Sequence, residues 1–158
     1  MSARWLEDDE QRAWRVYLRA TRELNAAMDR DLAPLGISLA EYELLSMLSE
    51  QPGGQARMSV LAELIVQSRS RMTHTAKRLG DRGWLDRRPS TEDRRGVVVT
   101  LTGEGRAALK RAAPAHVESV RRNFIDLLSA DQIGALRDIF GAVRAELVPG
   151  ATAADRVC

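Results

Sequence analysis

Apolar residues recur at three- and four-residue steps from residue 8 to residue 33, while charged residues fill the positions between them. This spacing puts the apolar side chains on one face and predicts a long amphipathic helix. Pro34 and Gly36 follow at once and should end it. The apolar positions of this helix are Trp14, Tyr17, Leu18, Thr21, Leu24, Met28 and Leu32.

Three shorter helices are predicted in the middle of the chain. Ser38 and Glu41 fit a capping box before a helix over 39–50, because a hydroxyl and a Glu three residues later satisfy the free N–H groups. Arg57 and Met58 form a candidate for a very short strand. Ser59 is then expected to cap a short helix that carries Val60, Leu61, Leu64 and Ile65.

The third short helix is predicted over 69–82, with Ser68 as its cap and Gly83 at its end. A hairpin should follow, because residues 84–88 and the β-branched run 97–101 flank the polar stretch 90–96.

Two more helices complete the chain. Thr102 should cap a helix over 103–127, in which Pro114 removes one hydrogen bond and should introduce a kink. Ser129 and Gln132 form another capping box before the last helix. The stripe of this last helix is Ile133, Leu136, Ile139, Phe140 and Val143.

This order of elements predicts a mostly α fold with a small β-hairpin: a winged helix-turn-helix of six helices and a two- or three-stranded wing. Residues 38–102 would form the winged lobe, and residues 149–158 a flexible tail. The helices of 1–37 and 103–148 keep apolar stripes that so small a chain cannot cover, so we expect an obligate homodimer in which they pair.

The helix predicted over 69–82 has two chemically distinct faces. Met72, Ala76 and Leu79 fall within about 60° on a helical wheel and should face the core. The opposite arc carries hydrogen-bond donors and cations and no acid. Such an arc suits the major groove of double-stranded DNA, whereas a merely solvated helix usually mixes charge signs. Its residues are Ser70, Arg71, Thr73, His74, Lys77 and Arg78, with Ser68 just before them.

Composition and charge support this interpretation. The chain has 158 residues, of which 44% are hydrophobic and 29% charged, as expected for a folded domain. Its net charge of +2 is unevenly spread: residues 68–95 hold nine bases and four acids, whereas the rest holds 15 bases and 18 acids. A basic segment on a mildly acidic body indicates a polyanionic partner, although a solvated, charge-rich surface is the alternative.

The tip of the hairpin adds a second basic element. Arg94 and Arg95 would lie there, where an arginine can enter a narrow minor groove, and Asp93 could orient the Arg95 guanidinium. A charged loop kept polar for solubility is the alternative.

These motifs resemble those of the multiple-antibiotic-resistance (MarR) regulators. Residues 68–87 look like that family's recognition helix and first wing strand, and residues 93–105 match its Asp-x-Arg-Gly wing signature followed by Leu-Thr-x-x-Gly. The resemblance covers about residues 8–148, with two departures: Gly80, where the family often has a charged helix former, and Pro114. It implies a triangular homodimer on a pseudopalindromic operator, with Arg95 as the wing arginine and Asp93 as its partner.

Members of that family are usually repressors that small phenolic or lipophilic ligands release. Candidate lining residues for such a ligand here are Trp14, Tyr17, Tyr42 and His116. Aromatic residues at helical spacing are also common in cores, and a lone histidine near a kink is often structural. Thiol sensing is disfavoured, since the single cysteine, Cys158, lies at the far end of the chain.

Other functional classes find less support in the sequence. The two histidines and one cysteine show no metal-site spacing, no Gly-rich phosphate loop or catalytic triad is evident, and no cofactor is expected. A protein-interaction module without DNA specificity remains a distinct alternative. With neither an export signal nor an apolar run long enough to cross a bilayer, we expect a bacterial cytoplasmic protein without membrane contact, located at the nucleoid when bound to DNA.

Overall fold

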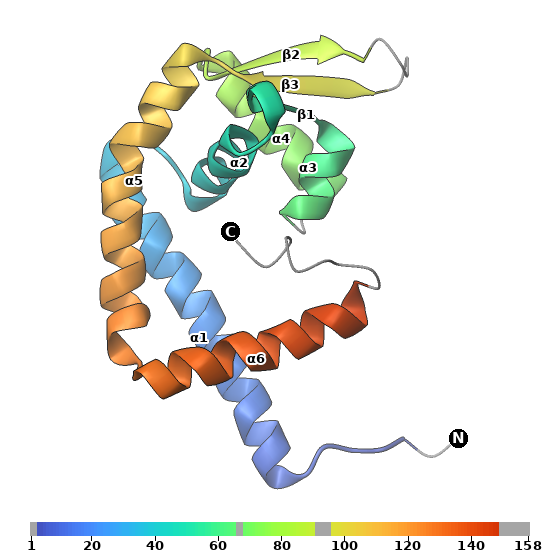
Figure 1. Cartoon of the computed structure of the whole chain (residues 1–158), viewed down its shortest axis with the longest axis vertical. Helices are drawn as coiled ribbons and strands as arrows, with labels where there is room; N and C mark the ends of the chain where they lie inside the picture. The colour runs from blue at the N-terminus through green and yellow to red at the C-terminus, as the bar shows by residue number, and fades with distance from the viewer. Residues whose placement is uncertain (1–2, 66–67, 91–95, 149–158) are drawn as a thin grey trace.

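Three long helices frame the molecule. The computed structural model describes residues 3–65, 68–90 and 96–148. Helix α1 (Asp8–Leu32) and helix α5 (Gly103–Asn123) pack against each other, and α6 (Ala130–Leu147) crosses α1 away from the rest of the chain (Figure 1). Short 3-10 turns occupy Ala33–Leu35, Pro52–Gly54 and Ile125–Leu127.

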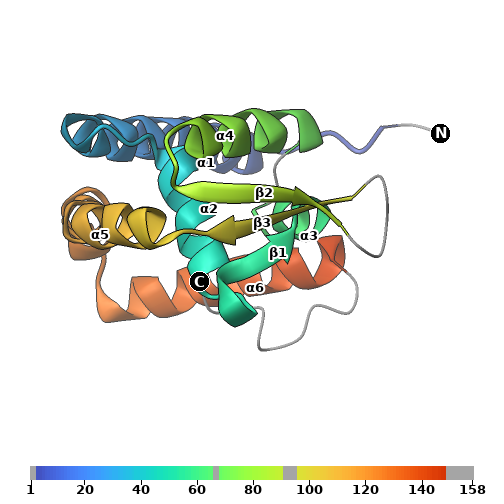
Figure 2. The same ribbon diagram turned by 90° about the horizontal axis from the view of Figure 1, so that it is seen from above.

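The remaining elements form a compact lobe. Helices α2 (Leu39–Ser49), α3 (Met58–Leu64) and α4 (Arg69–Asp81) pack beside a small antiparallel sheet (Figure 2). Its strands β1 (Gln55–Arg57), β2 (Leu85–Pro89) and β3 (Val97–Leu101) lie in the order β1-β3-β2, with Ala56 opposite Val99 and Leu85 opposite Leu101. Three helices followed by a hairpin that pairs with a preceding strand make a winged helix-turn-helix, so the predicted fold is confirmed.

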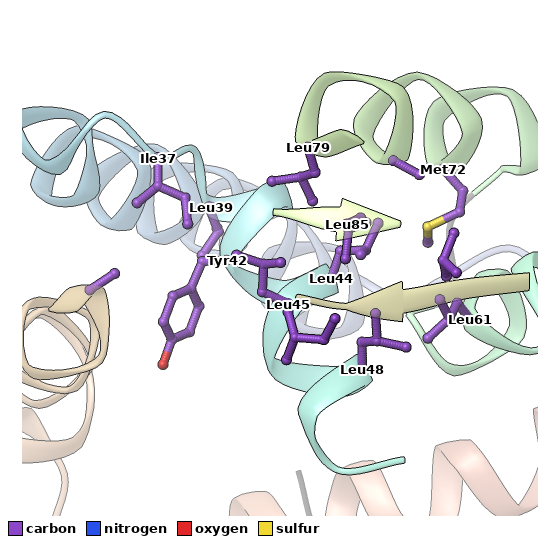
Figure 3. Close-up of a cluster of buried hydrophobic side chains, with 14 of the residues drawn as sticks. Ile37, Leu39, Tyr42, Leu44, Leu45, Leu48, Leu61, Met72, Leu79 and Leu85 are labelled. Atoms are coloured by element: carbon purple, nitrogen blue, oxygen red, sulfur yellow. The ribbon is translucent and has the colours of Figure 1, made fainter. Parts of the chain in front are cut away.

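Leucines dominate the core of this lobe. Leu44, Leu45 and Leu48 from α2 are fully buried and meet Leu61 from α3 (Figure 3). Val99 lies opposite them on the sheet and is also fully buried. The same cluster includes Leu32 of α1 and Ala112 of α5, so the lobe is held by its own elements and also packs onto the long helices.

Four helix starts confirm the predicted caps. The hydroxyls of Ser38, Ser68, Thr102 and Ser129 each accept a hydrogen bond from the backbone N–H three residues later. Complete capping boxes form at the starts of α2 and α6. These caps depend on neighbouring residues alone, which is why sequence reading located them.

Three local predictions are wrong in detail. The short strand is Gln55–Arg57 rather than Arg57 and Met58, because pairing with β3 selects its residues. As a result α3 already begins at Met58, with Arg57 rather than Ser59 at its N-cap. The helix predicted over 103–127 ends at Asn123 and gives way to a 3-10 turn, although it does continue through Pro114. The predicted tail 149–158 lies outside the described residues.

A polar cluster joins α1 to α5. The carboxylate of Asp31 accepts hydrogen bonds from Ser119 (2.5 Å), Arg122 (2.7 Å) and Asn123 (3.4 Å). The Ser119 hydroxyl is the largest of the contributions that lower the pKa of Asp31, with the Arg122 charge adding to it. These bonds fix the end of α1 against α5 close to the point where the chain enters the lobe.

Apolar side chains remain exposed on α1 and α6. Trp14 and Val16 of α1, and Ile139 and Val143 of α6, each leave more than two fifths of their surface open. None of the residues described in α6 is buried. Exposed apolar stripes of this extent are typical of surfaces that pair with another chain.

Candidate nucleic-acid interface

Helix α4 carries its apolar residues on one face only. Met72, Ala76 and Leu79 are at most 1% exposed, and Figure 3 shows Met72 and Leu79 directed into the leucine cluster. The buried stripe fixes the rotation of α4 about its axis, because turning the helix would bring polar residues into the core. The predicted core face of this helix is confirmed.

The opposite face of α4 is open to solvent. The exposed residues include all six members of the predicted arc: Ser70, Arg71, Thr73, His74, Lys77 and Arg78. Ser68 is exposed as well, and its hydroxyl accepts the Arg71 N–H at 3.3 Å. Donors and cations thus lie together on one exposed face of α4.

Two cations of this arc have acidic partners. Lys77 Nζ lies 2.8 Å from Asp81, and both side chains are largely exposed. Such pairs contribute under about 1 kcal/mol, so Lys77 can exchange Asp81 for another anion at little cost. Arg78 instead bonds at 2.8 Å to Glu41 of α2, whose side chain is 2% exposed. Sequence reading missed this contact because Glu41 is 37 residues away.

A second carboxyl group of α2 lies within electrostatic reach of the arc. Burial raises the pKa of Glu43, and the positive charge of Arg71 partly opposes that rise. Arg71 itself stays exposed near the start of α4. Arg71 is thus exposed and at the same time close enough to Glu43 for its charge to lower the pKa of that half-buried acid.

The wing extends from the same lobe. Arg87 and Arg88 are exposed on β2, and Arg88 pairs with Asp86 at 2.7 Å. The Ser90 N–H donates to the carbonyl of Gly96 at 2.8 Å and closes the ladder at the outer end of the strands. The predicted wing-tip residues Asp93, Arg94 and Arg95 lie outside the described residues.

Two hydrogen-bonded junctions connect α4 to the wing and to α5. Gly83 ends α4 with φ +73°, which allows the Trp84 N–H to reach the Leu79 carbonyl at 2.9 Å. Thr102 donates its hydroxyl proton to the Gly83 carbonyl (2.8 Å) and accepts the N–H of Gly105 (3.0 Å). The Leu-Thr-x-x-Gly motif thus has a structural role: it fastens the start of α5 to the end of α4.

The four predicted ligand-lining residues fall into two separate pairs. Trp14 stacks on Tyr17 at 5.6 Å between ring centroids, and Tyr17 contacts Phe140 of α6. Tyr42 meets His116 at 4.2 Å, between α2 and α5. Trp14 and Tyr17 thus lie near α6, and Tyr42 and His116 lie between α2 and α5, while a ligand cleft lined by all four residues stays a prediction.

A shallow hollow adjoins the first pair. It has a volume of about 270 Å³ and is lined by Trp5, Leu6, Gln11, Trp14 and Arg15. Of the predicted lining residues it includes Trp14 alone. The sequence signal for it was weak, because Trp5 and Leu6 precede the periodic stretch.

His116 occupies an unusual environment in the second pair. Its Nδ1 atom is buried and finds no hydrogen-bond partner among the residues that the structure describes. Burial also lowers the pKa of its imidazole, which favours the neutral ring at neutral pH. Among the described residues, the ring therefore has a buried nitrogen without a hydrogen-bond partner, next to the ring of Tyr42.

Metal and membrane sites are not evident in the described part of the chain. The residues at 3–65, 68–90 and 96–148 contain no group of three or more His, Cys, Asp or Glu side chains placed to hold a metal ion. Nor does any helix within these ranges have the length and apolarity needed to cross a bilayer.

Comparisons with known proteins agree with this geometry. The model of the MarR family matches residues 37–97. The HTH-type transcriptional regulator PecS of Dickeya dadantii is 30% identical over 131 residues, which cover 82% of this chain and 78% of PecS. A repressor of Mycobacterium tuberculosis, Rv2887, is 34% identical over 68% of this chain and 75% of its own length.

Solved structures extend the similarity to nearly the whole chain. AbsC, a MarR family transcriptional regulator from Streptomyces coelicolor, is 39% identical with a TM-score of 0.83 and covers 92% of this chain and 98% of its own. Sco3205 from the same organism, solved in complex with DNA, is 37% identical with a TM-score of 0.86 and covers 96% of each chain. This chain therefore belongs to the MarR family of transcriptional regulators.

Proposed function

We propose that the protein is a repressor that binds a pseudopalindromic DNA operator as a homodimer in the bacterial cytoplasm. The observation that carries the proposal is the exposed face of α4, where donors and cations lie opposite a fully buried apolar stripe. The DNA complex of the similar Sco3205 supports the same assignment. Residues 38–102 would read the operator, and residues 1–37 and 103–148 would hold the dimer.

The α4 face would enter the major groove. In this arrangement Arg71 and Lys77 supply charged donors for guanine edges or phosphates, and the hydroxyls of Ser70 and Thr73 bond to phosphates. Ser68 and His74 complete this set at its margins. The wing residues Asp93, Arg94 and Arg95 are proposed for the minor groove by their sequence motif alone.

The exposed stripes on α1 and α6 supply the reason for dimerisation. A second copy would cover Trp14 and Val16 of α1 and Ile139 and Val143 of α6, all of which one chain leaves exposed. Two-fold symmetry would then place the two copies of α4 about 34 Å apart, one turn of B-DNA. Analytical ultracentrifugation should report twice the mass of the chain.

Selection of bound sequences from random duplex DNA tests the function. We expect an inverted repeat whose half-site centres are about 10 base pairs apart. Arg71→Ala should then weaken operator binding, whereas Arg111→Ala, which removes the same charge from α5, should have little effect. Equal affinity for the selected operator and for a scrambled duplex would refute sequence-specific regulation and favour an interaction module or a general DNA binder.

We also propose that a small planar ligand with an acidic or phenolic group releases the operator by binding at the Tyr42–His116 pair. The unpartnered Nδ1 of His116 and the neighbouring ring of Tyr42 support this choice. A set of aromatic acids and phenols should include a member that shifts tryptophan fluorescence and lowers operator affinity. If neither signal changes across the set, or if His116→Phe responds like the wild type, the proposal fails.

A further inference from the structure

Glu41 receives more hydrogen bonds than its capping role requires. One oxygen, Oε2, accepts the backbone N–H of Ser38 at 2.9 Å and the Ser38 hydroxyl at 3.0 Å, which completes the capping box of α2. The other oxygen, Oε1, accepts a hydrogen bond from the Arg78 guanidinium at 2.8 Å. A capping box uses a single oxygen, so the second is committed to α4.

Arg82 adds a second connection from the end of α4. Its guanidinium lies 3.8 Å from Glu41 Oε2 and donates to the carbonyl of Gly36 at 2.7 Å. It also sits over the Trp84 ring, 3.5 Å from the centroid. Arg82, at the C-cap of α4, therefore contacts three separate segments. These are the start of α2, the turn between α1 and α2, and the residue just before β2.

Because Glu41 is buried, its contact with Arg78 strongly affects the stability of the fold. Its side chain is 2% exposed, and a buried carboxylate without its cationic partner is strongly destabilising, whereas most surface ion pairs contribute little. Arg78 is the partner that completes the charge pair, while roughly half of its own side chain remains exposed. The pair therefore favours one placement of the α4 C-terminal half relative to α2.

We propose that Glu41, acting through Arg78, is a positioning residue that sets the angle at which α4 meets DNA. This role rests on the proposed function and refines it: Arg78, although it belongs to the exposed arc, serves α4 placement rather than base or phosphate contact. Arg71 lies two turns from Arg78, about 10 Å along the helix axis. A tilt of about 5° at Arg78 would displace Arg71 by about 1 Å, enough to impair hydrogen bonds to base edges.

Glu41→Gln separates the two functions of this side chain. Glutamine at this position still completes a capping box through its amide oxygen. Its NH₂ group would then face the Arg78 guanidinium, donor against donor, and the charge of the pair is lost. Arg78→Gln makes the complementary change from the exposed side. Because it leaves the buried Glu41 carboxylate without Arg78, it should also lower stability, and Arg78→Lys is the variant that keeps the charge of the pair.

The experiment measures the affinity of each purified variant for the selected operator and for a scrambled duplex of equal length, at several salt concentrations. We expect Glu41→Gln and Arg78→Gln each to lose about tenfold or more in operator affinity with unchanged binding to the scrambled duplex. The double variant should be no weaker than the weaker single variant, and Arg78→Lys should recover part of the loss. Asp81→Asn is the matched control, because it breaks an exposed ion pair of equal length on the same helix.

Two results would overturn the positioning role. Operator affinity within twofold of the wild type, together with a lower melting temperature, would mean that the pair only stabilises the fold. A salt dependence reduced by about one phosphate contact in Arg78→Gln would mean that Arg78 itself touches the backbone. Should Glu41→Gln fail to fold, Arg78→Gln and Arg78→Lys decide between these outcomes. A wild-type protein without operator preference would instead refute the proposed function.

Discussion

Gly105 in the first turn of α5 lies too close to the wing to carry a side chain. A Cβ at this position would overlap the backbone carbonyl of Trp84 and lie 2.8 Å from Cδ1 of Leu101. The carbonyl cannot retreat freely, because it accepts the N–H of Thr102 at 3.2 Å. We therefore predict that Gly105→Ala destabilises the protein, although alanine is normally the better helix former.

The magnitude follows from three contributions, of which two destabilise the variant and one stabilises it. Overpacking a tight site costs about 1–3 kcal/mol, and losing the backbone hydrogen bond of Trp84 adds about 1 kcal/mol. The higher helix propensity of alanine returns at most about 1 kcal/mol. The net loss should be about 1–3 kcal/mol, or a melting temperature lower by roughly 2–12 °C for a chain of this size.

Urea unfolding at one fixed protein concentration is the appropriate assay, because the stability of a dimer depends on concentration. Gly103→Ala is the matched control: it lies two residues earlier in the same helix, and a Cβ there would have no neighbouring atom within 4 Å. It should leave stability unchanged or raise it by up to about 1 kcal/mol. A Gly105→Ala protein as stable as Gly103→Ala would refute the packing argument.

Two further predictions concern stability. Thr102→Val keeps the side-chain shape but removes the bonds to Gly83 and Gly105, so it should cost about 1–2 kcal/mol in urea unfolding, whereas Thr102→Ser should retain most of the stability. The pKa of His116 lies below its usual value of 6.5 because the ring is buried, so below pH 6.5 the unfolded chain takes up the proton first. The free energy of unfolding should therefore fall as the pH drops below 6.5. His116 should contribute up to about 1.4 kcal/mol per pH unit to this fall. This contribution should be absent in His116→Gln, and above pH 6.5 it should be absent in both proteins.

The two-faced character of α4 was available from the sequence. Met72, Ala76 and Leu79 recur at helical spacing, and their burial leaves the opposite arc exposed whatever the partners of the helix are. The same holds for Ser38, Ser68, Thr102 and Ser129, whose capping bonds span only three residues. The winged helix-turn-helix order followed from these local signals and from the resemblance of residues 68–87 and 93–105.

Other features depend on segments distant in sequence. The choice of Gln55–Arg57 as β1 comes from pairing with β3, and the division of the aromatic residues into Trp14–Tyr17 and Tyr42–His116 comes from the packing of α1 against α6 and of α2 against α5. Neither has a signal in local spacing, because the partners are set by the three-dimensional path of the chain.

Sequence alone thus determined which faces of the helices are apolar, where the helices with Ser or Thr caps begin, and that α4 presents cations, since these properties arise from neighbouring residues. Only the tertiary structure decided which of those cations are already engaged. Glu41 and Arg78 are 37 positions apart in sequence and meet because the leucine core brings α2 and α4 together. Because the Glu41 carboxylate is buried, Arg78 is held in place by this pair, unlike the other cations of the exposed arc.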